Sequence, residues 1–343
     1  MSASITLTHA GAGSSLELVP DAGMVAVSWV VAGDEVLALP CGREEFLAAA
    51  RTGGIPLLYP YANRLGADSF AVCGKPVDLA RVPSLKRDDT RHPIHGLMLR
   101  RGGWSLAVLG PGQLQAELDW GAHPELMGAF PFAHTLRITW RLVAGGSPGA
   151  ASLHVDTEVH ADRGVDVPVA FGWHPYFHVH DSAGAQVRMA PAAGVALDAA
   201  GLPVDGAVSR ARGAAGAVAP GPGVGSEGAG ERRDRVGQGQ DALYLRKELG
   251  TVARASPAAS ITDAHRRIDV LMDAHYPFMQ VFSPRGASFA CIEPMTAPTD
   301  GLRSGDCPVA RAGGTFRAAF EVRVIPCPPT SMTGSPTPPS PAA

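Results

Sequence analysis

The chain has 343 residues, 45% of them hydrophobic and 18% charged, with a formal net charge of −3 at pH 7. The hydrophobic fraction is ample for a packed core, and the charge excludes a general electrostatic attraction to nucleic acid or to anionic membranes. The five cysteines are scattered and form no CxxC pair, so neither a disulfide framework nor a thiolate zinc site is indicated.

The first residues, MSASITLTHAG, lack the basic segment and the apolar run that are typical of a signal peptide. No uncharged apolar stretch is long enough to span a bilayer. We therefore expect a cytoplasmic protein, a monomer or a homodimer, that has neither a membrane nor a nucleic acid as its partner.

The segment GGIPLLYPYANRL at 53–65 joins polar side chains to glycine, proline and aromatic neighbours, and it ends shortly after Asn63 and Arg64. Arginine presents five N–H donors in a fixed geometry and keeps its charge. Arg64 is therefore a candidate for binding hydroxyl groups, the alternative being a surface arginine that follows a loop. Asn63 is the neighbouring candidate.

The segment HPIHGL at 92–97 places His92 and His95 three residues apart. This spacing raises the question of a metal site, but the proline between the two histidines disfavours a shared helix face. We interpret His92 as structural, keep His95 as a candidate for proton chemistry, and predict no metal ligands.

Apolar residues alternate with polar ones in several segments from residue 114 onward, which is the pattern of half-buried strands. The alternating positions are Leu114, Ala116, Leu118 and Trp120; Leu136, Ile138, Trp140 and Leu142; Leu153, Val155, Thr157 and Val159; and Phe316, Ala318, Phe320, Val322 and Val324. No long amphipathic helix is indicated, and 41 glycines with 30 prolines fit many strands joined by turns. The pattern predicts an all-β fold, a large antiparallel sandwich, and the length allows one large domain or two ordinary ones.

The run VDVPVAFGWHPYF at 165–177 contains a single histidine, His174. Read as one strand, the run places alternate apolar side chains on one face and His174 on the other, beside the small residues Ala170 and Gly172. A histidine with a free pKa of about 6.5 can act as acid or base near neutrality. The local pattern leaves two interpretations open, a functional histidine and a structural one that bonds a backbone group.

Glu293 stands at the end of the apolar run SFACI, within IEPMTAPTDGL at 292–302. Pro294 follows it and forces the chain out of regular strand pairing, so this carboxylate is well placed to line a cleft. Partial burial raises the pKa of such a carboxyl group and makes it a better base. The alternative is a surface glutamate on an edge strand.

Two stretches differ in composition from the rest. Residues 207–239 are rich in Ala, Gly and Pro, and we predict a long, mobile surface insertion there. Its glycines form neither GxGxxG nor a P-loop, so nucleotide binding is not indicated. The tail 326–343 is rich in Pro, Ser and Thr and is predicted to be disordered.

The four segments at 53–65, 92–97, 171–177 and 292–302, taken in order, resemble the aldose 1-epimerase (galactose mutarotase) family. The resemblance implies the twisted, many-stranded β-supersandwich of that family, in one domain over residues 1–325, and an enzyme that needs no cofactor. It makes His174 the general acid that protonates the sugar ring oxygen and Glu293 the general base that takes the proton of the anomeric hydroxyl. His95 becomes a second donor near these oxygens, and Arg64 becomes a substrate-binding residue.

The same resemblance extends to residues whose local sequence is less distinctive. It makes Asp241, in GQDALYL, a carboxylate that accepts sugar hydroxyls, and Gln280, in PFMQVFSP, is a further polar contact. Tyr176, with Trp173 and Phe177, offers an apolar face for pyranose C–H groups or belongs to the core.

The hypothesis that follows is an isomerase that interconverts the α and β anomers of a free aldohexose through the open-chain aldehyde, with a bell-shaped dependence of rate on pH. Three alternatives stay open at this point. One is a hexose-6-phosphate 1-epimerase, with Lys86, Arg87 and Arg91 as the basic groups. The others are a sugar-binding module without catalysis, and a metal-dependent hydrolase that uses His92, His95 and His174.

Overall fold

The computed structural model describes residues 3–49, 51–213, 232–247 and 256–327. Strands dominate it, and the α-helices within these residues have at most seven residues each. They are α1 (Arg43–Ala48), α2 (Pro124–Ala129), α3 (Ala207–Gly213) and α4 (Gly301–Ser304). Short 3-10 turns add η1 (Ala10–Ala12), η2 (Pro20–Ala22), η3 (Leu79–Arg81) and η4 (Trp120–Ala122). The prediction of an all-β fold is confirmed.

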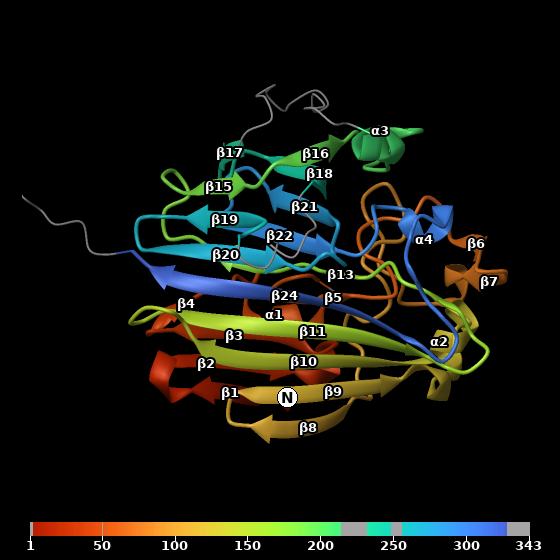
Figure 1. Cartoon of the computed structure of the whole chain (residues 1–343), viewed down its shortest axis with the longest axis horizontal. Helices are drawn as coiled ribbons and strands as arrows, with labels where there is room; N and C mark the ends of the chain where they lie inside the picture. The colour runs from red at the N-terminus through yellow and green to blue at the C-terminus, as the bar shows by residue number, and fades with distance from the viewer. Residues whose placement is uncertain (1–2, 50, 214–231, 248–255, 328–343) are drawn as a thin grey trace, which may run out of the picture.

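A nine-stranded antiparallel sheet forms one layer, in the order β17-β15-β19-β20-β24-β11-β10-β9-β8, and Figure 1 shows it running from β17 at the top to β8 at the lower border. Its strands are β8 (Ser105–Gly110), β9 (Gln113–Asp119), β10 (His134–Ala144), β11 (Ala151–Ala161), β15 (Gln186–Met189), β17 (Arg232–Arg235), β19 (Ala259–Thr262), β20 (Arg266–Met272) and β24 (Thr315–Pro326).

A seven-stranded sheet forms the layer that carries the site. Its order is β16-β18-β21-β22-β13-β5, with β14 also paired to β22. Its strands are β5 (Leu57–Leu58), β13 (Gly172–Trp173), β14 (Tyr176–His178), β16 (Ala192–Val195), β18 (Gln240–Arg246), β21 (Phe278–Ser283) and β22 (Phe289–Met295).

Three smaller sheets complete the fold. The first 35 residues contribute a four-stranded sheet, and two hairpin-sized sheets pair β6 with β7 and β12 with β23. Their strands are β1 (Ile5–His9), β2 (Ser14–Val19), β3 (Val25–Val31), β4 (Asp34–Glu35), β6 (Ser69–Val72), β7 (Lys75–Asp78), β12 (Val167–Pro168) and β23 (Val309–Ala310).

The core lies between the nine-stranded and seven-stranded sheets, where aromatic side chains join them. Trp173 on β13 lies edge-on to Trp140 on β10, with ring centroids 5.2 Å apart, and also contacts Phe320 on β24. Both tryptophans are fully buried. Because an edge-to-face pair of large rings buries much apolar area, this contact is a major stabilising link between the two layers.

The alternating positions predicted from the sequence face this core. Apart from Phe316, which is half-buried, their side chains are buried. Trp120 is buried as well, but it stands in η4 rather than at the end of a strand. Its indole N–H donates to the carbonyl oxygen of Phe130, which satisfies its one polar atom inside the core.

The prediction of one continuous strand over 165–177 is wrong. Residues of this run belong to three short strands: β12 pairs with β23, β13 pairs with β22 and β5, and β14 pairs with β22. The run contains Pro168 and Pro175, and proline lacks the N–H group that a continuous ladder requires.

Both ends of the stretch 207–239 are built into the fold. The helix α3 buries Ala207 and Ala211 against the seven-stranded sheet, and β17 pairs with β15 at the border of the nine-stranded sheet. Residues 214–231, on which most of the predicted insertion falls, lie outside the described residues, as do residues 328–343 of the predicted tail. Pro326, where that tail was predicted to begin, is the last residue of β24.

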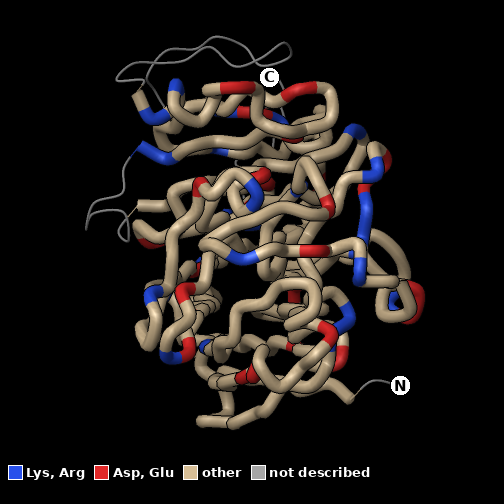
Figure 2. The backbone as a smooth tube through the Cα atoms, turned by 90° about the vertical axis from the view of Figure 1, so that its right-hand side faces the viewer, with Lys and Arg blue, Asp and Glu red and all other residues tan. Residues whose placement is uncertain are grey.

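Acidic and basic residues are interspersed along the chain on the side that Figure 2 turns to the viewer. This agrees with the formal net charge of −3. Within the described ranges, no helix has the length and apolar character needed to cross a membrane.

Candidate active site

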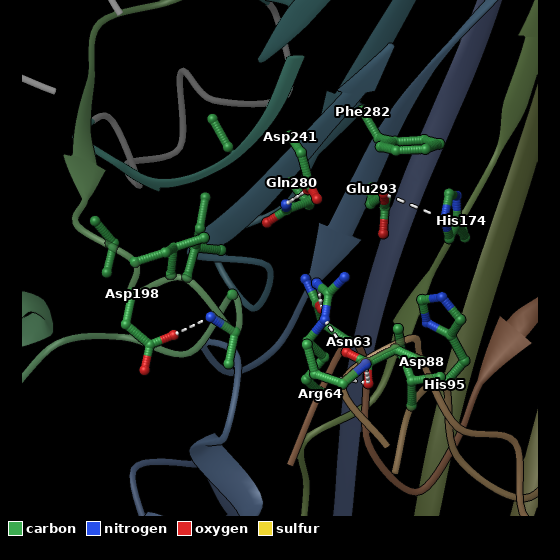
Figure 3. Close-up of a pocket in the computed structure, with 18 of the residues that line it drawn as sticks. Asn63, Arg64, Asp88, His95, His174, Asp198, Asp241, Gln280, Phe282 and Glu293 are labelled. Carbon is green, nitrogen blue, oxygen red and sulfur yellow. Dashed lines mark hydrogen bonds and ion pairs between the residues drawn. The ribbon is translucent and has the colours of Figure 1, made fainter. Parts of the chain in front are cut away.

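A cavity of about 920 Å³ opens over the seven-stranded sheet. Four polar side chains on one face of this sheet form its floor, namely Asp241 on β18, Gln280 on β21, Glu293 on β22 and His174 beside β13 (Figure 3). The strand register brings them together, since Gln280 pairs directly with Glu293. Gly172 pairs with Met295 and Tyr176 with Cys291, so His174 lies at the level of Glu293.

His174 and Glu293, predicted from separate segments, form a direct contact. The Nε2 atom of His174 lies 3.4 Å from Oε1 of Glu293, and the two side chains are only 5% and 2% exposed. The Nδ1 atom of His174 has no hydrogen-bond partner among the described residues. A buried polar atom that is left unpaired in this way is costly, and such atoms concentrate where a ligand completes the network.

Burial disfavours the charged form of both groups. Desolvation, and then the positive charge of Lys86, lower the pKa of His174 to about 3. Desolvation and the nearby Asp241 carboxylate raise the pKa of Glu293 well above its usual range, against an opposing effect of Arg64. Burial therefore favours the uncharged form of the couple, with the proton on Glu293 and His174 neutral, over the carboxylate–imidazolium pair.

His95 completes a histidine pair over the couple. Its ring stands edge-on to that of His174, with centroids 5.2 Å apart, and its Nδ1 atom has no partner among the described residues. Burial, and then His174, lower the pKa of His95 well below its usual range. His95 and Asn63 both adopt left-handed backbone conformations, with φ of 67° and 54°. Such strained residues occur at functional sites, where the surrounding structure enforces them.

Arg64 reaches over the cavity from the opposite side, held by two acceptors. Its Nε–H donates to Oδ2 of Asp88 at 2.6 Å, and its Nη1–H donates to Oδ1 of Asn63 at 3.1 Å. Figure 3 shows the terminal nitrogens of Arg64 directed toward the space beside Glu293 and Gln280. Since a guanidinium group has five N–H donors, these two bonds leave donors for a ligand.

The segment around Asp300 supports Arg64 from behind. The Asp300 backbone N–H donates to the Arg64 carbonyl oxygen at 2.9 Å, and its Oδ1 accepts from the Gly66 N–H at 2.8 Å. Arg303 in turn donates to the Asp300 carboxylate. The segment 292–302 thus fixes the position of Arg64 in the segment 53–65.

Asp241 and Gln280 form the far side of the floor. The Nε2–H of Gln280 donates to Oδ1 of Asp241. The Gln280 side chain is 1% exposed, and its Oε1 atom has no partner among the described residues. A ligand with several hydroxyl groups would find an acceptor here on each side chain.

Tyr176 lines the cavity and supports His174. The two rings are stacked, with centroids 4.5 Å apart, and the Tyr176 hydroxyl lies 2.7 Å from Oγ1 of Thr52 and 3.4 Å from Nε2 of His174. Trp173 and Phe177, considered above with Tyr176 either as an apolar face for a ligand or as core, are fully buried and belong to the core.

Several lining residues escaped the sequence analysis. They include Thr52, Asp88, Phe282 and the turn at 197–201. This turn is closed by Asp198, whose Oδ1 accepts the N–H groups of Ala200 and Leu202. Gly201 has φ of 76°, and a Cβ atom there would lie 3.0 Å from Nη1 of Arg64. The sequence could have indicated Gly201 as a turn residue, but no local pattern relates this glycine to Arg64.

The structure separates His92 from the other histidines of the proposed metal hydrolase. His92 does not line the cavity, and its Nδ1 atom lies 2.8 Å from Oγ1 of Thr90. In the described part of the chain, no three His, Cys, Asp or Glu side chains are grouped so as to hold a metal ion.

Fold and site together define a large β-sandwich protein with a polar cavity that contains a buried His–Glu couple. A family model described as aldose 1-epimerase matches residues 4–323, so the chain belongs to the aldose 1-epimerase family. A search of curated proteins gives no significant match.

Forty-eight chains of solved structure match this fold. A protein from Synechocystis shares 20% identity at a TM-score of 0.70, covering 95% of this chain and 96% of its own. Galactose 1-epimerase from Lactobacillus acidophilus shares 15% sequence identity at a TM-score of 0.69, and the match covers 94% of each chain. A GalM/aldose epimerase homologue from C. elegans shares 14% sequence identity at a TM-score of 0.69, and the match covers 94% of this chain and 98% of the homologue. The chain therefore has the galactose mutarotase-like fold.

Proposed function

We propose that the protein is an aldose 1-epimerase that interconverts the α and β anomers of a free aldohexose. The observation that carries this proposal is the buried contact of His174 and Glu293 at 3.4 Å, at the floor of a cavity with unpaired polar atoms. Ring opening of a hemiacetal needs one group that removes the O1 proton and one that protonates the ring oxygen O5. A couple that carries a single proton supplies both.

The proton first moves from Glu293 to His174 as substrate binds, which produces a carboxylate and an imidazolium. Glu293 then removes the O1 proton, His174 protonates O5, and the C1–O5 bond breaks to give the open-chain aldehyde. Rotation about C1–C2 presents the other face of the carbonyl group. In the reverse steps His174 takes the O5 proton while Glu293 returns a proton to O1, so no proton is lost from the couple.

Burial of the couple costs free energy in the first proton transfer and returns it when the ring opens. The closed sugar requires the charged couple, whereas the open-chain intermediate is paired with protonated Glu293 and neutral His174. The pKa of Glu293 is raised and that of His174 is lowered, so the buried site favours the second state. The free energy that was needed to form the charged couple in the buried site is thereby released in the step that breaks the C1–O5 bond. His95 and Arg64 lie where they can donate hydrogen bonds to the oxygens of the substrate.

The charges around the cavity support a neutral sugar over a hexose phosphate. Its described lining has five carboxyl groups and three cationic side chains, which are Asp88, Asp89, Asp198, Asp241 and Glu293 against Arg64, Lys86 and Arg87. Arg87 donates to both oxygens of Asp68, and Arg64 donates to Asp88. The third basic residue of the phosphate alternative, Arg91, does not line the cavity. A phosphate dianion would therefore enter a site with more acidic than basic groups.

Polarimetry on freshly dissolved sugars tests this proposal. We expect the protein to accelerate the mutarotation of α-D-glucose or α-D-galactose, with kcat/KM for D-glucose 6-phosphate lower by about tenfold or more, because like charges oppose its binding. Acceleration confined to the phosphorylated sugar would replace the proposed substrate class. Calorimetric binding of a free sugar without acceleration by the folded protein would replace catalysis by a binding role.

A further inference from the structure

The exposed large apolar side chains of the described residues are concentrated in one short strand. Leu106, Val108 and Leu109, all on β8, are 41%, 65% and 54% exposed. Solvated apolar side chains that stand singly are common, but a contiguous group of them marks an interaction surface.

The strand β8 is also an open edge. It ends the nine-stranded sheet, and β9 is its strand partner among the described residues, so its other side presents unpaired N–H and C=O groups. Natural proteins protect such edges with charged residues or proline. The sequence SLAVLG at 105–110 contains neither, and Figure 1 shows the strand along the lower border of the molecule.

Leu106 and Val108 lie on the face of the sheet that is turned toward the core. They pair with Ala116 and Leu114 of β9, which are both fully buried. The core thus covers the inner face of β9 but ends before that of β8. Leu106 and Val108 thus form an exposed apolar strip at the edge of the sheet. A further strand with apolar side chains on the same face would cover it.

We propose that the protein forms a two-fold symmetric dimer in which β8 pairs antiparallel with β8 of a second copy. An antiparallel pair keeps side chains of the same face opposite one another, so a two-fold axis through Ala107 places Leu106 of each copy opposite Val108 of the other. The dimer therefore contains two equivalent Leu106–Val108 contacts, which shield these side chains from solvent. The two nine-stranded sheets become one continuous sheet.

The strand itself favours a second copy over another partner. An isologous interface must be complementary to itself, and an uncharged strand with apolar residues on either side of a small central alanine meets that condition. Two chains with a net charge of −3 also need a neutral contact region, which SLAVLG provides. The bulge of β8 lies between Val108 and Gly110, at one end of the proposed contact. A short strand pair buries a small area, so we expect a micromolar dissociation constant.

Sedimentation velocity over a range of protein concentrations tests the dimer, and the measurement does not depend on any enzymatic activity. The wild type is expected to shift from monomer to dimer with concentration. Val108→Lys places a charge in the apolar contact and should raise the dissociation constant by about tenfold or more. Ala71→Lys is the matched control, because Ala71 is an exposed strand residue of the separate β6–β7 sheet, and it should leave the dimer unchanged.

The double variant Leu106→Glu, Val108→Lys tests the register. Each glutamate would then face a lysine of the other copy, so the dimer should reform and weaken again at high salt. A wild type that stays monomeric at all concentrations would overturn the proposal. So would a dimer that Val108→Lys leaves intact, or a double variant that dissociates at least as completely as Val108→Lys alone.

Discussion

Among the described residues several histidines lie beside carboxylates, and two of these clusters, at His174 and at His180, differ in how completely the histidine nitrogens are hydrogen-bonded. At the site, His174 meets Glu293 at 3.4 Å in a buried setting, and Nδ1 of His174 is left unpaired among the described residues. At the other cluster, Nδ1 and Nε2 of His180 lie 3.0 Å from Asp263 and 3.0 Å from Asp34. Arg266 also donates to Asp34.

The pKa values move in opposite directions. Burial lowers the pKa of His174 to about 3. Burial also opposes the charge of His180, but its hydrogen bonds to Asp263 and Asp34 raise its pKa above the ordinary value. At His180, hydrogen bonds to two carboxylates favour the charged form of the histidine and contribute to stability. A buried histidine with an unpaired nitrogen is held neutral and is available for proton transfer. The same residue types thus give a structural link in one place and a candidate catalytic couple in the other.

Replacing each histidine should separate the two clusters by activity. His174→Gln is expected to lower kcat/KM by about 10²- to 10⁴-fold, the usual contribution of a general acid or base. His180→Gln, the matched control, should keep kcat/KM within about threefold of the wild type, because the described partners of His180 do not line the cavity; they are Asp34, Asp263, His178 and His265. Polarimetry on one free aldose measures both variants, and equal losses of activity would contradict the distinction.

The pH dependence of kcat/KM sharpens the comparison. The couple works while it holds one proton, so activity falls at low pH as His174 gains a second proton and at high pH as Glu293 loses the first. The lowered pKa of His174 places the acidic limb below about pH 5, and the raised pKa of Glu293 moves the alkaline limb upward. An acidic limb near the usual pKa of histidine would show that burial does not control the couple.

How Arg64 is held can be tested through Asp88. Asp88→Ala removes the charged acceptor of the Arg64 Nε–H and should raise KM by about tenfold or more with little change in kcat. Asp88→Asn keeps an acceptor and should recover part of this loss. Asp89→Ala, at the next position of the same cavity lining, is the control.

A double-mutant cycle decides whether Asp88 acts through Arg64. In an Arg64→Ala background, Asp88→Ala should have little further effect on KM. An undiminished effect in that background would instead assign Asp88 a role in the structure of its own loop, where its Oδ1 accepts from the backbone N–H groups of Thr90 and His92.

The smallest effect is expected on stability at the His180 cluster. Because the folded-state pKa of His180 is raised, its stabilising contribution is fully present below the unfolded pKa and is lost as pH rises through the folded pKa. His180→Gln should therefore lower the free energy of unfolding more at pH 6 than at pH 9, by no more than about 1 kcal/mol because the side chain is partly solvated. Urea unfolding at the two pH values measures this, and a pH-independent difference would contradict it.

The sequence predicts the site residues better than it predicts how they are held. Alternating apolar positions predict β9, β10, β11 and β24 of the nine-stranded sheet, and distinctive segments point to His174, Glu293, His95 and Arg64. The prediction of one strand over 165–177 was wrong because strand pairing there depends on neighbours far along the chain. Asp88 was missed because the segment DDT reads as an ordinary turn. Its contact with Arg64 joins residues 24 positions apart, which no local pattern reveals.

The central claim, that Glu293 and His174 together open the sugar ring, is tested most directly by the rate of anomer exchange in Glu293→Gln. This substitution keeps the size of the side chain but removes its ability to exchange the proton. We predict a loss in kcat/KM of at least about 100-fold for a free aldose, with the melting temperature maintained. A folded Glu293→Gln protein that exchanges anomers near the wild-type rate would contradict the proposed mechanism.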